Sequence, residues 1–441
     1  LSSRIPHLSS LISRHSSLIS NLPPLISYLA YLISHLSSPI SHLPSVIAQA
    51  GAGGARARFA GAGEFDRVNR TVYQAFLVSV VLAVGVMAPV GYWLAPTLLA
   101  LVRAAPEVQV EALPYIRIQF VFSIGMLIFF MFSGALRSAG DARTPMRLGI
   151  LMTALNIALN IVLIRGLGPI PAFGTRGAAM GTALASGITG LVFIWMLFSN
   201  RLVIHFSRSM SFRPDWPIIR SLFRFGLPAG FQGIAMNLGG VLMYRFIGSL
   251  RFSGEAQAAY AVVYSQLFSL ITWTSVGLMG ATAAVAGQNL GAGHPERSAR
   301  SAHLASMMGL TVAVTIGLLF FVFPRPLLAI FGMEDGVVAD IAVELLGYLA
   351  FSGVFVTVAL AYTGGLQGTG DTRSPLYISI MSQVVVPLGI CAVLQATSGL
   401  EAHDIWLAIL IGHITRCVLS VMRFRQGKWR NIAIDIGPAR A

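Results

Sequence analysis

Charged residues are scarce in this chain of 441 residues, and acidic residues are scarcer than basic ones. Only 10% of the residues are charged, with 16 Asp and Glu against 30 Lys and Arg. Soluble domains carry about 25% charged residues. Because 55% of the chain is hydrophobic and its mean hydropathy is +0.75, a water-soluble fold could not bury its apolar surface. The composition therefore predicts an all-α polytopic membrane protein, whose helices satisfy their backbone hydrogen bonds within lipid.

Residue types that carry most enzyme and metal chemistry are also sparse or dispersed. The two cysteines, Cys391 and Cys417, are too few for a disulfide framework. The histidines show no metal-ligand spacing. A phosphate-binding loop of the form Gly-x-x-x-x-Gly-Lys-Ser/Thr is missing, which argues against ATP-driven transport. We therefore predict neither an enzyme nor a resident metal or cofactor.

The basic residues, which give a net charge of +14, lie in small groups between apolar runs. This pattern is typical of loops beside a membrane and not of a nucleic-acid-binding face. Alternate loops differ about threefold in Lys and Arg, with Arg416 counted in the richer set. The bias predicts a multi-pass protein of the cell (inner or plasma) membrane with a cytoplasmic C-terminus. Its expected partners are lipid, a small organic substrate and a coupling cation, and we expect a monomer.

The chain divides into a low-complexity start and a regular remainder. Residues 1–45 repeat Leu, Ile, Ser, His and Pro, and we predict that they are poorly ordered or foreign to the rest of the protein. Further on, apolar runs recur with the roughly 20 residues that cross a bilayer. We predict ten spans, at about 74–102, 115–133, 146–164, 175–198, 222–247, 256–284, 302–323, 342–365, 376–395 and 404–422.

Two motifs recur at one fixed offset of 230 residues, which indicates an internal repeat. Gly61-Ala62-Gly63 matches Gly291-Ala292-Gly293, and Gly140-Asp141-Ala142-Arg143-Thr144-Pro145 matches Gly370-Asp371-Thr372-Arg373-Ser374-Pro375. Since six spans separate equivalent points, both copies cross in the same sense, as two parallel bundles related by a pseudo-twofold axis along the membrane normal. The predicted divisions are an incomplete first repeat over 46–210, a complete second repeat over 211–425 and a cytoplasmic tail over 426–441.

The repeat implies a plan of twelve helices, of which about ten are clear. Residues 1–45 occupy the place of the first two helices without having their composition. We therefore expect a truncated or scrambled N-terminus, and an inactive, incomplete transporter is one alternative for this chain.

The motifs, taken in order, resemble those of the multidrug and toxic compound extrusion (MATE) family over roughly residues 55–425. Besides the paired loops, the segment Asn156–Ile164 resembles the family's fifth helix, Gly174–Thr182 the start of its sixth, and Gly226-Leu227-Pro228 the start of its seventh. The resemblance implies a proton- or sodium-coupled exporter of cationic, amphipathic organic compounds. The alternative within the same superfamily is a flippase of lipid-linked oligosaccharides, which a cleft lined by several Arg and Lys would favour.

The family resemblance also marks a cation site. Asn156 and Asn160 share one face of a helix because they are four residues apart, and Thr182 matches a family threonine on the sixth helix. The family commonly has Asp at the position of Asn160, and its first-helix Asp has no counterpart here. Because an amide cannot take up and release a proton, proton coupling through this site is doubtful. Interhelical hydrogen bonding is the other interpretation, and Asp340 and Glu344 are the fallback cation ligands.

The repeated loops and the apolar spans supply the remaining candidates. In Gly140, Asp141, Arg143 and Pro145, and in Gly370, Asp371, Arg373 and Pro375, the Asp can cap the helix that follows, which predicts a rigid elbow; a gating ion pair is the alternative. A substrate cleft needs apolar walls with a few polar groups, and aromatic faces attract organic cations. The predicted cleft residues are Gln119, Met126 and Phe129 in the first half and Gln232, Met236, Asn237, Tyr244, Tyr260, Tyr264, Gln266 and Trp273 in the second.

Overall fold

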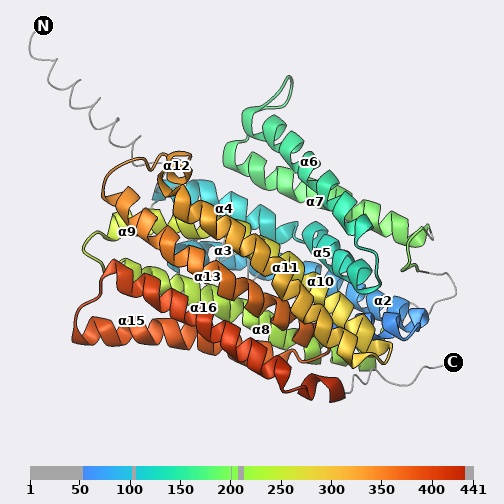
Figure 1. The fold of residues 1–441 in the computed structure, drawn as a ribbon. Coiled ribbons are helices and arrows are strands. Elements are labelled where there is room, and N and C mark those ends of the chain that lie inside the picture. Colours follow the sequence, from blue (N-terminus) through green and yellow to red (C-terminus); the bar gives the residue numbers. More distant parts are fainter. Residues whose placement is uncertain (1–52, 102–105, 200, 207–212, 433–441) are drawn as a thin grey trace, which may run out of the picture.

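The computed structural model describes residues 53–101, 106–199, 201–206 and 213–432, and in these ranges the chain is helical throughout its regular structure (Figure 1). The predictions for residues 1–45, and for the part of the tail beyond 432, lie outside the described residues. The first half begins with a helix over residues 53–61. It continues with α2 (Phe65–Leu82), the π-helix η1 (Ala83–Met87), α3 (Ala88–Leu101), α4 (Pro106–Val121), α5 (Ile124–Ser138), α6 (Arg143–Arg165) and α7 (Gly174–Phe198).

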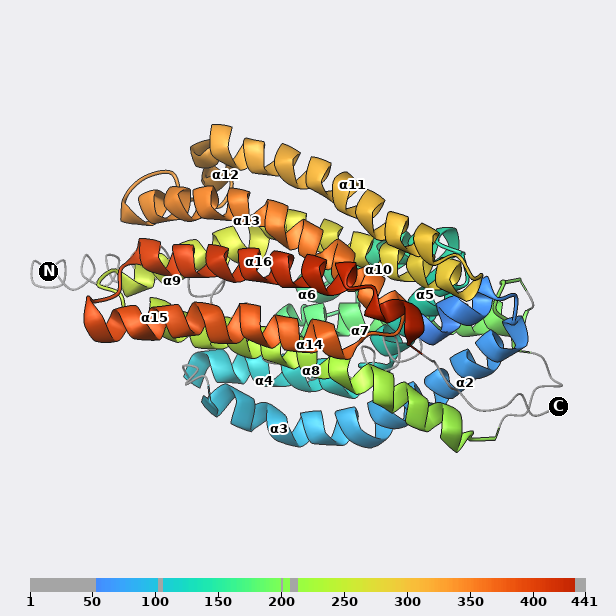
Figure 2. The same cartoon turned by 60° about the horizontal axis from the view of Figure 1, so that its bottom comes forward.

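The second half repeats this order of helices. It also contains α8 and α9, whose counterparts in the first repeat would precede the helix over residues 53–61. Figure 2 shows its last helices, α14, α15 and α16, running alongside α8. Its elements are α8 (Trp216–Ile247), α9 (Ser253–Val262), η2 (Val263–Leu267), α10 (Ser269–Gly291), α11 (Pro295–Val322), α12 (Pro324–Ala329), α13 (Val337–Gly368), α14 (Arg373–Ile380), η3 (Met381–Val385), α15 (Val386–Thr397), α16 (Ala402–Arg425) and the short 3-10 helix η4 (Lys428–Asn431).

The helices begin where the sequence supplies caps for their free N–H groups. The side chain of Asp215 accepts a hydrogen bond from the Ile218 N–H at the start of α8. Glu401 and Asp404 form a capping box at the start of α16, in which the side chain of each residue accepts a hydrogen bond from the backbone N–H of the other. Such caps contribute about 1 kcal/mol each.

Among the described residues, eight helices are long and apolar enough to cross a membrane, and a ninth span exists if α4 and α5 count as one. The predicted span 115–133 runs across the break between α4 and α5, which are bent by 48°. Nine of the ten predicted spans overlap these candidates. The missing one, 222–247, forms most of α8, but Gln232, Asn237 and several glycines lower its hydropathy.

The exposed surface of the bundle is apolar, which marks lipid as its solvent. On α6, Ile150, Ile157 and Ile161 are each more than half exposed, while the Asn156 side chain of that helix bonds to α7. On α11, Leu318 and Phe321 are likewise exposed. This inversion of the pattern of soluble proteins confirms the prediction of a polytopic membrane protein.

The two halves have matching helix contacts and matching backbone geometry. Helix α2 packs on α5 as α11 packs on α13, and α7 packs on α4 and α5 as α16 packs on α13. Gly63 and Gly293 have φ of 78° and 79°, and Gly140 and Gly370 have φ of 96° and 101°. Such left-handed conformations favour glycine, which explains why the motif glycines recur at the offset that the sequence shows.

The halves meet in a symmetric crossing of two equivalent helix ends. A Cβ added to Gly61 would overlap the backbone of Gln288 on α10, and a Cβ added to Gly291 would overlap the backbone of Arg58. Gly61 is equivalent to Gly291 in the repeat, and Arg58 is equivalent to Gln288. The contact is therefore self-complementary, as a twofold axis requires.

The same crossing gathers the repeated loops at one end of the molecule, which we call the glycine-loop end. The Gln288 side chain donates to the Ser138 carbonyl over 2.8 Å, next to Gly140. Gly54, on the helix over residues 53–61, lies against the backbone at Gly370. Gly140 and Gly370 thus lie on the same side of the membrane, as a parallel repeat predicts.

Candidate functional site

The three residues predicted to bind a cation lie together between α6 and α7. The Asn160 amide donates to Oδ1 of Asn156 over 3.2 Å, and the Asn156 amide donates to Oγ1 of Thr182 over 3.0 Å. Thr182 in turn donates to the Ala178 carbonyl over 3.1 Å. The four-residue spacing in α6 and the one-turn spacing in α7 therefore produce a continuous polar chain inside an apolar helix pair.

This chain of neutral groups is rich in oxygen and has one unsatisfied acceptor. Among the described residues, Oδ1 of Asn160 is buried and accepts no hydrogen bond. It lies where a Cβ on Gly181 would be, so the glycine leaves room for it. A buried acceptor without a donor is costly. Hard cations are bound by oxygen ligands such as amide carbonyls and hydroxyls, so the arrangement suits a small hard cation.

The fallback ligands lie at the opposite end of α13 from the glycine loops and face outward. Asp340 forms an ion pair with Arg325 over 3.1 Å, and the Asp340 side chain is 69% exposed. Glu344 is also exposed. The structure therefore places both acids at a solvated helix entrance, away from any enclosed site.

A cavity of about 210 Å3 opens within the second half. It lies between α8, η2, η3 and α16, near the middle of each long helix. Four of the predicted cleft residues line it, namely Met236, Asn237, Tyr260 and Tyr264, and Tyr244 packs edge-on against Tyr260. The remaining lining residues are Gly239, Gly240, Met243, Ser382, Gln383, Pro387, Ile409 and His413.

Two π-helical turns shape this cavity. Tyr264 belongs to η2, and Ser382 and Gln383 belong to η3. A π-turn inserts one extra residue into an α-helix, which displaces side chains from their helical register and often marks a functional site. The Tyr260 and Tyr264 rings stack at 4.8 Å between centroids and form one aromatic wall.

The other predicted cleft residues of the second half lie elsewhere. Gln232 is buried in a hydrogen-bond network, donating to Ser379 over 2.9 Å and accepting from Gln367 over 3.1 Å. Gln266 is exposed, and Trp273 is 71% exposed. Hydrophobic periodicity does not distinguish a cavity-facing position from a lipid-facing one, because the cavity wall and the lipid are both apolar surroundings.

The predicted cleft residues of the first half do not gather around this cavity. Gln119 donates to the Tyr115 hydroxyl over 3.3 Å within α4. Met126 is half-buried on α5. Phe129 is buried in an aromatic core, with its ring 5.8 Å from that of Phe193. Phe129 therefore packs the first half.

Sequence reasoning missed two buried basic side chains on α16. His413 lines the cavity and is 3% exposed, and Arg416, three residues further on, is also 3% exposed. Arg416 was counted with the loop residues, but it lies about 14 Å along the helix from Arg425, at a rise of about 1.5 Å per residue. An isolated arginine inside an apolar run, nine residues before the helix ends, is the signal that could have revealed it.

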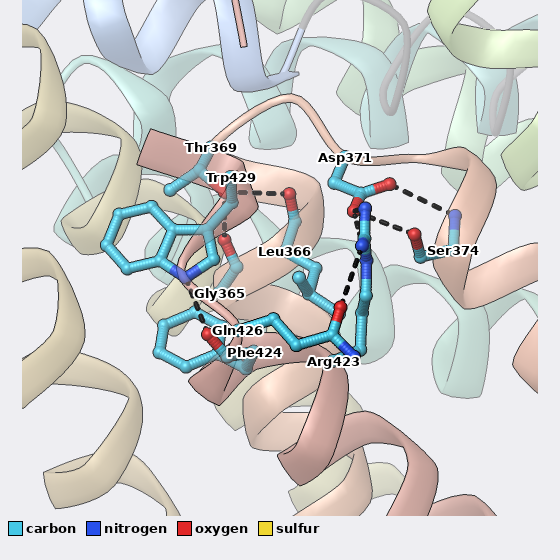
Figure 3. A network of polar contacts seen from close by, with 9 residues as sticks. All are labelled: Gly365, Leu366, Thr369, Asp371, Ser374, Arg423, Phe424, Gln426 and Trp429. Carbon is cyan, nitrogen blue, oxygen red and sulfur yellow. Dashed lines mark hydrogen bonds and ion pairs between the residues drawn. The ribbon is translucent and has the colours of Figure 1, made fainter. Parts of the chain in front are cut away.

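The repeated Asp residues both cap the helix that follows them. Oδ1 of Asp141 accepts from the Thr144 N–H, and Oδ1 of Asp371 accepts from the Ser374 N–H, each over 3.0 Å. Figure 3 shows that Asp371 also binds Arg423 of α16, with its Oδ2 at 2.8 Å from the guanidinium. This ion pair joins elements of one half only, so it favours the rigid elbow over a gate between the halves.

The two elbows differ in what holds them. The residue equivalent to Arg423 in the first half is Phe193, which is buried in the aromatic core and offers no charge. Asp371 is 5% exposed, whereas Asp141 is only half-buried. The second elbow is therefore tied to α16, while in the part of the chain that the structure describes the Asp141 side chain makes the helix cap alone.

We predict unequal losses of stability when these acids are removed. Asp141→Ala should cost about 1 kcal/mol, the value of a helix cap. Asp371→Ala should cost about 2–4 kcal/mol, because it also removes the hydrogen bonds to the half-buried Arg423 guanidinium, and hydrogen bonds to charged groups contribute about 1.5–3 kcal/mol. Thermal unfolding of the purified protein in detergent measures both, and Arg423→Gln in the Asp371→Ala background should recover part of the loss. Equal shifts in melting temperature for the two alanine variants would refute the asymmetry.

Together, the parallel halves, the buried polar chain and the cavity of the second half define a multi-pass membrane transporter. A family model described as MatE matches residues 34–162 and 228–393, more than half of the chain. The chain belongs to the MatE family, whose members are transporters and not enzymes. The match to the model confirms the family resemblance drawn from the sequence motifs.

Known proteins with similar sequences and folds agree with this family. A probable multidrug resistance protein NorM of Thermotoga maritima is 28% identical over 331 residues, which cover 74% of this chain and 69% of that protein. A MOP superfamily transporter from Pyrococcus furiosus has a TM-score of 0.82 at 20% identity, covering 94% of this chain and 93% of that one. An outward-facing multidrug resistance MATE family transporter gives a TM-score of 0.81 at 20% identity, with 92% and 88% covered.

Proposed function

We propose that this protein exports small amphipathic organic compounds across the cell membrane in exchange for sodium ions. The observation that carries the coupling is the polar chain of Asn160, Asn156 and Thr182, with its unsatisfied amide oxygen. Its groups are neutral oxygens, which can bind Na+ but cannot carry a proton. The names of similar proteins as multidrug resistance proteins support the assignment of an exporter.

The crossing at the glycine-loop end supplies the gate that alternating access needs. Glycines let the helix over residues 53–61 and α10 approach closely enough to seal this end. Since the loops of this end carry most of the Lys and Arg, we place it in the cytoplasm. Removing the buried Arg416 from that count leaves the bias in the same direction. In this state the substrate path is closed to the cytoplasm.

The substrate is proposed to bind in the cavity of the second half. The stacked faces of Tyr260 and Tyr264 support the family expectation of a cationic, aromatic compound, because ring faces attract organic cations. A flippase of lipid-linked oligosaccharides would need several Arg and Lys in the cleft. Within the described part of the chain, the residues lining this cavity include neither, so the exporter remains the favoured function.

The proposal is tested with the full chain in everted membrane vesicles, across whose membrane a Na+ gradient is imposed to drive uptake of a dye. We expect the cationic dye rhodamine 123 to accumulate in the vesicles only when the gradient is present. Collapse of the Na+ gradient should abolish accumulation, whereas collapse of a proton gradient should leave it intact. Dye accumulation that survives loss of the Na+ gradient would exclude sodium coupling. A chain that reaches the membrane but moves no dye would favour the inactive transporter.

A further inference from the structure

The cavity of the second half contains polar side chains that the protein itself does not satisfy. Among the described residues, Nδ1 of His413 and Oγ of Ser382 are buried and have no hydrogen-bond partner. Both residues line the cavity, and Ser382 is fully buried on η3. Leaving buried polar atoms unpaired costs free energy, and a ligand inside the cavity is the partner available to both.

A buried positive charge lies beside these two polar side chains. Arg416 follows His413 by three residues, so the two side chains share one face of α16. Arg416 interacts electrostatically with both His413 and Tyr264. No carboxylate of the residues that the structure describes lies within ion-pair distance of Arg416, and its Nε has no hydrogen-bond partner. A charge without a partner inside a membrane protein is costly and usually belongs to a functional site.

The cavity therefore has a positive charge, that of Arg416, behind its His413 side and an aromatic surface at another wall. Its lining, within the part of the chain that the structure describes, holds no Asp or Glu. Tyr260 stacks on Tyr264 and lies parallel to Trp406 at 6.0 Å, which offers a flat apolar surface. A ligand with a flat body and one acidic group would satisfy both walls.

We infer that the transported compound carries an anionic, carboxylate-type group, which accepts hydrogen bonds from the Ser382 hydroxyl and from His413 in its Nδ1–H tautomer, near the positive charge of Arg416, while its aromatic body lies on Tyr260 and Tyr264. The inference rests on the proposed function in taking this cavity as the substrate site. It makes a zwitterion a better substrate than a purely cationic compound of the same shape.

The test uses two dyes that differ in one group. Rhodamine 110 carries a free carboxylate, and rhodamine 123 is its methyl ester with the same cationic ring system. Binding to the purified full chain in detergent is followed by fluorescence anisotropy without any ion gradient. We expect rhodamine 110 to bind about tenfold or more tightly than rhodamine 123, because hydrogen bonds to charged groups are the stronger ones.

Variants on and off the cavity locate the effect. Arg416→Gln should remove the preference for the carboxylate, Arg416→Lys should keep most of it, and Ser382→Ala should reduce it with the smallest change in shape. Arg425→Gln, at an exposed position of the same helix, is the matched control and should leave the preference unchanged. Equal binding of the two dyes, or a preference that persists in both Arg416→Gln and Ser382→Ala, would overturn the inference. Because no gradient is used, a failure of sodium coupling would not affect this result.

Discussion

Replacing Asn156 with leucine should abolish the sodium dependence of dye export. Asn156 is the central member of the polar chain, since it accepts from Asn160 and donates to Thr182. Losing a residue that orients the ligands of a metal ion typically weakens binding by about 10-fold to 100-fold, and we expect at least that loss here. The measurement is the Na+ concentration that gives half-maximal accumulation of rhodamine 123 in everted vesicles.

Two further variants make this test specific to the site. Gly181→Ala places a methyl group where Oδ1 of Asn160 lies, so it should also weaken the Na+ dependence without changing any polar residue. Thr153→Val removes an exposed hydroxyl from the same helix and should change nothing. An Asn156→Leu protein with the Na+ dependence of the wild type would show that these amides only hold α6 and α7 together.

Substituting either crossing glycine with leucine should block closure of the glycine-loop end. A side chain at Gly61 would overlap Gln288, and one at Gly291 would overlap Arg58. Overpacking of this kind costs about 1–3 kcal/mol, which disfavours the closed state by roughly 5-fold to 150-fold. Because the contact is self-complementary, we expect Gly61→Leu and Gly291→Leu to reduce export to a similar extent.

The opening can be measured by the reactivity of a buried reporter at the crossing. Ser138→Cys, in a chain with Cys391 and Cys417 changed to serine, should react slowly with a maleimide from the cytoplasmic side because Ser138 is buried. Either leucine variant should make it react faster. Gly280→Leu, on α10 where an added side chain meets open space, is the control. Unchanged labelling in both leucine variants would mean that this crossing is not the gate.

Much of the fold follows from local patterns in the sequence. The apolar runs predict the helices. The offset of the glycine motifs predicts two parallel halves, because the left-handed backbone at positions 140 and 370 strongly favours glycine in both copies. The asymmetry of the two elbows does not follow, since it depends on Arg423, which is 52 residues from Asp371 along the chain. Long-range partners of this kind depend on how helices pack.

The candidate site, like the fold, has parts that the sequence predicts and parts that it does not. The spacing of Asn156 and Asn160 places both on one helix face, and the family resemblance adds Thr182, which the structure brings within 3.0 Å of Asn156. The cavity was only partly predictable. Tyr260 and Tyr264 are among the predicted cleft residues, but His413 and Arg416 are not, because the face of α16 that meets the cavity depends on how this helix packs against its neighbours.

The amino-acid pattern alone was enough to predict a membrane protein, built from two parallel copies of one module, with a polar face on α6. These are properties of composition, periodicity and turn geometry, which act over a few residues. Helix packing, in contrast, brings Gly61 and Gly291 against the opposite half, and it places Arg416, which has no carboxylate partner among the described residues, beside the cavity of the second half. Close approach and charge pairing depend on distances between segments far apart in the chain, and those distances are fixed only when the helices pack.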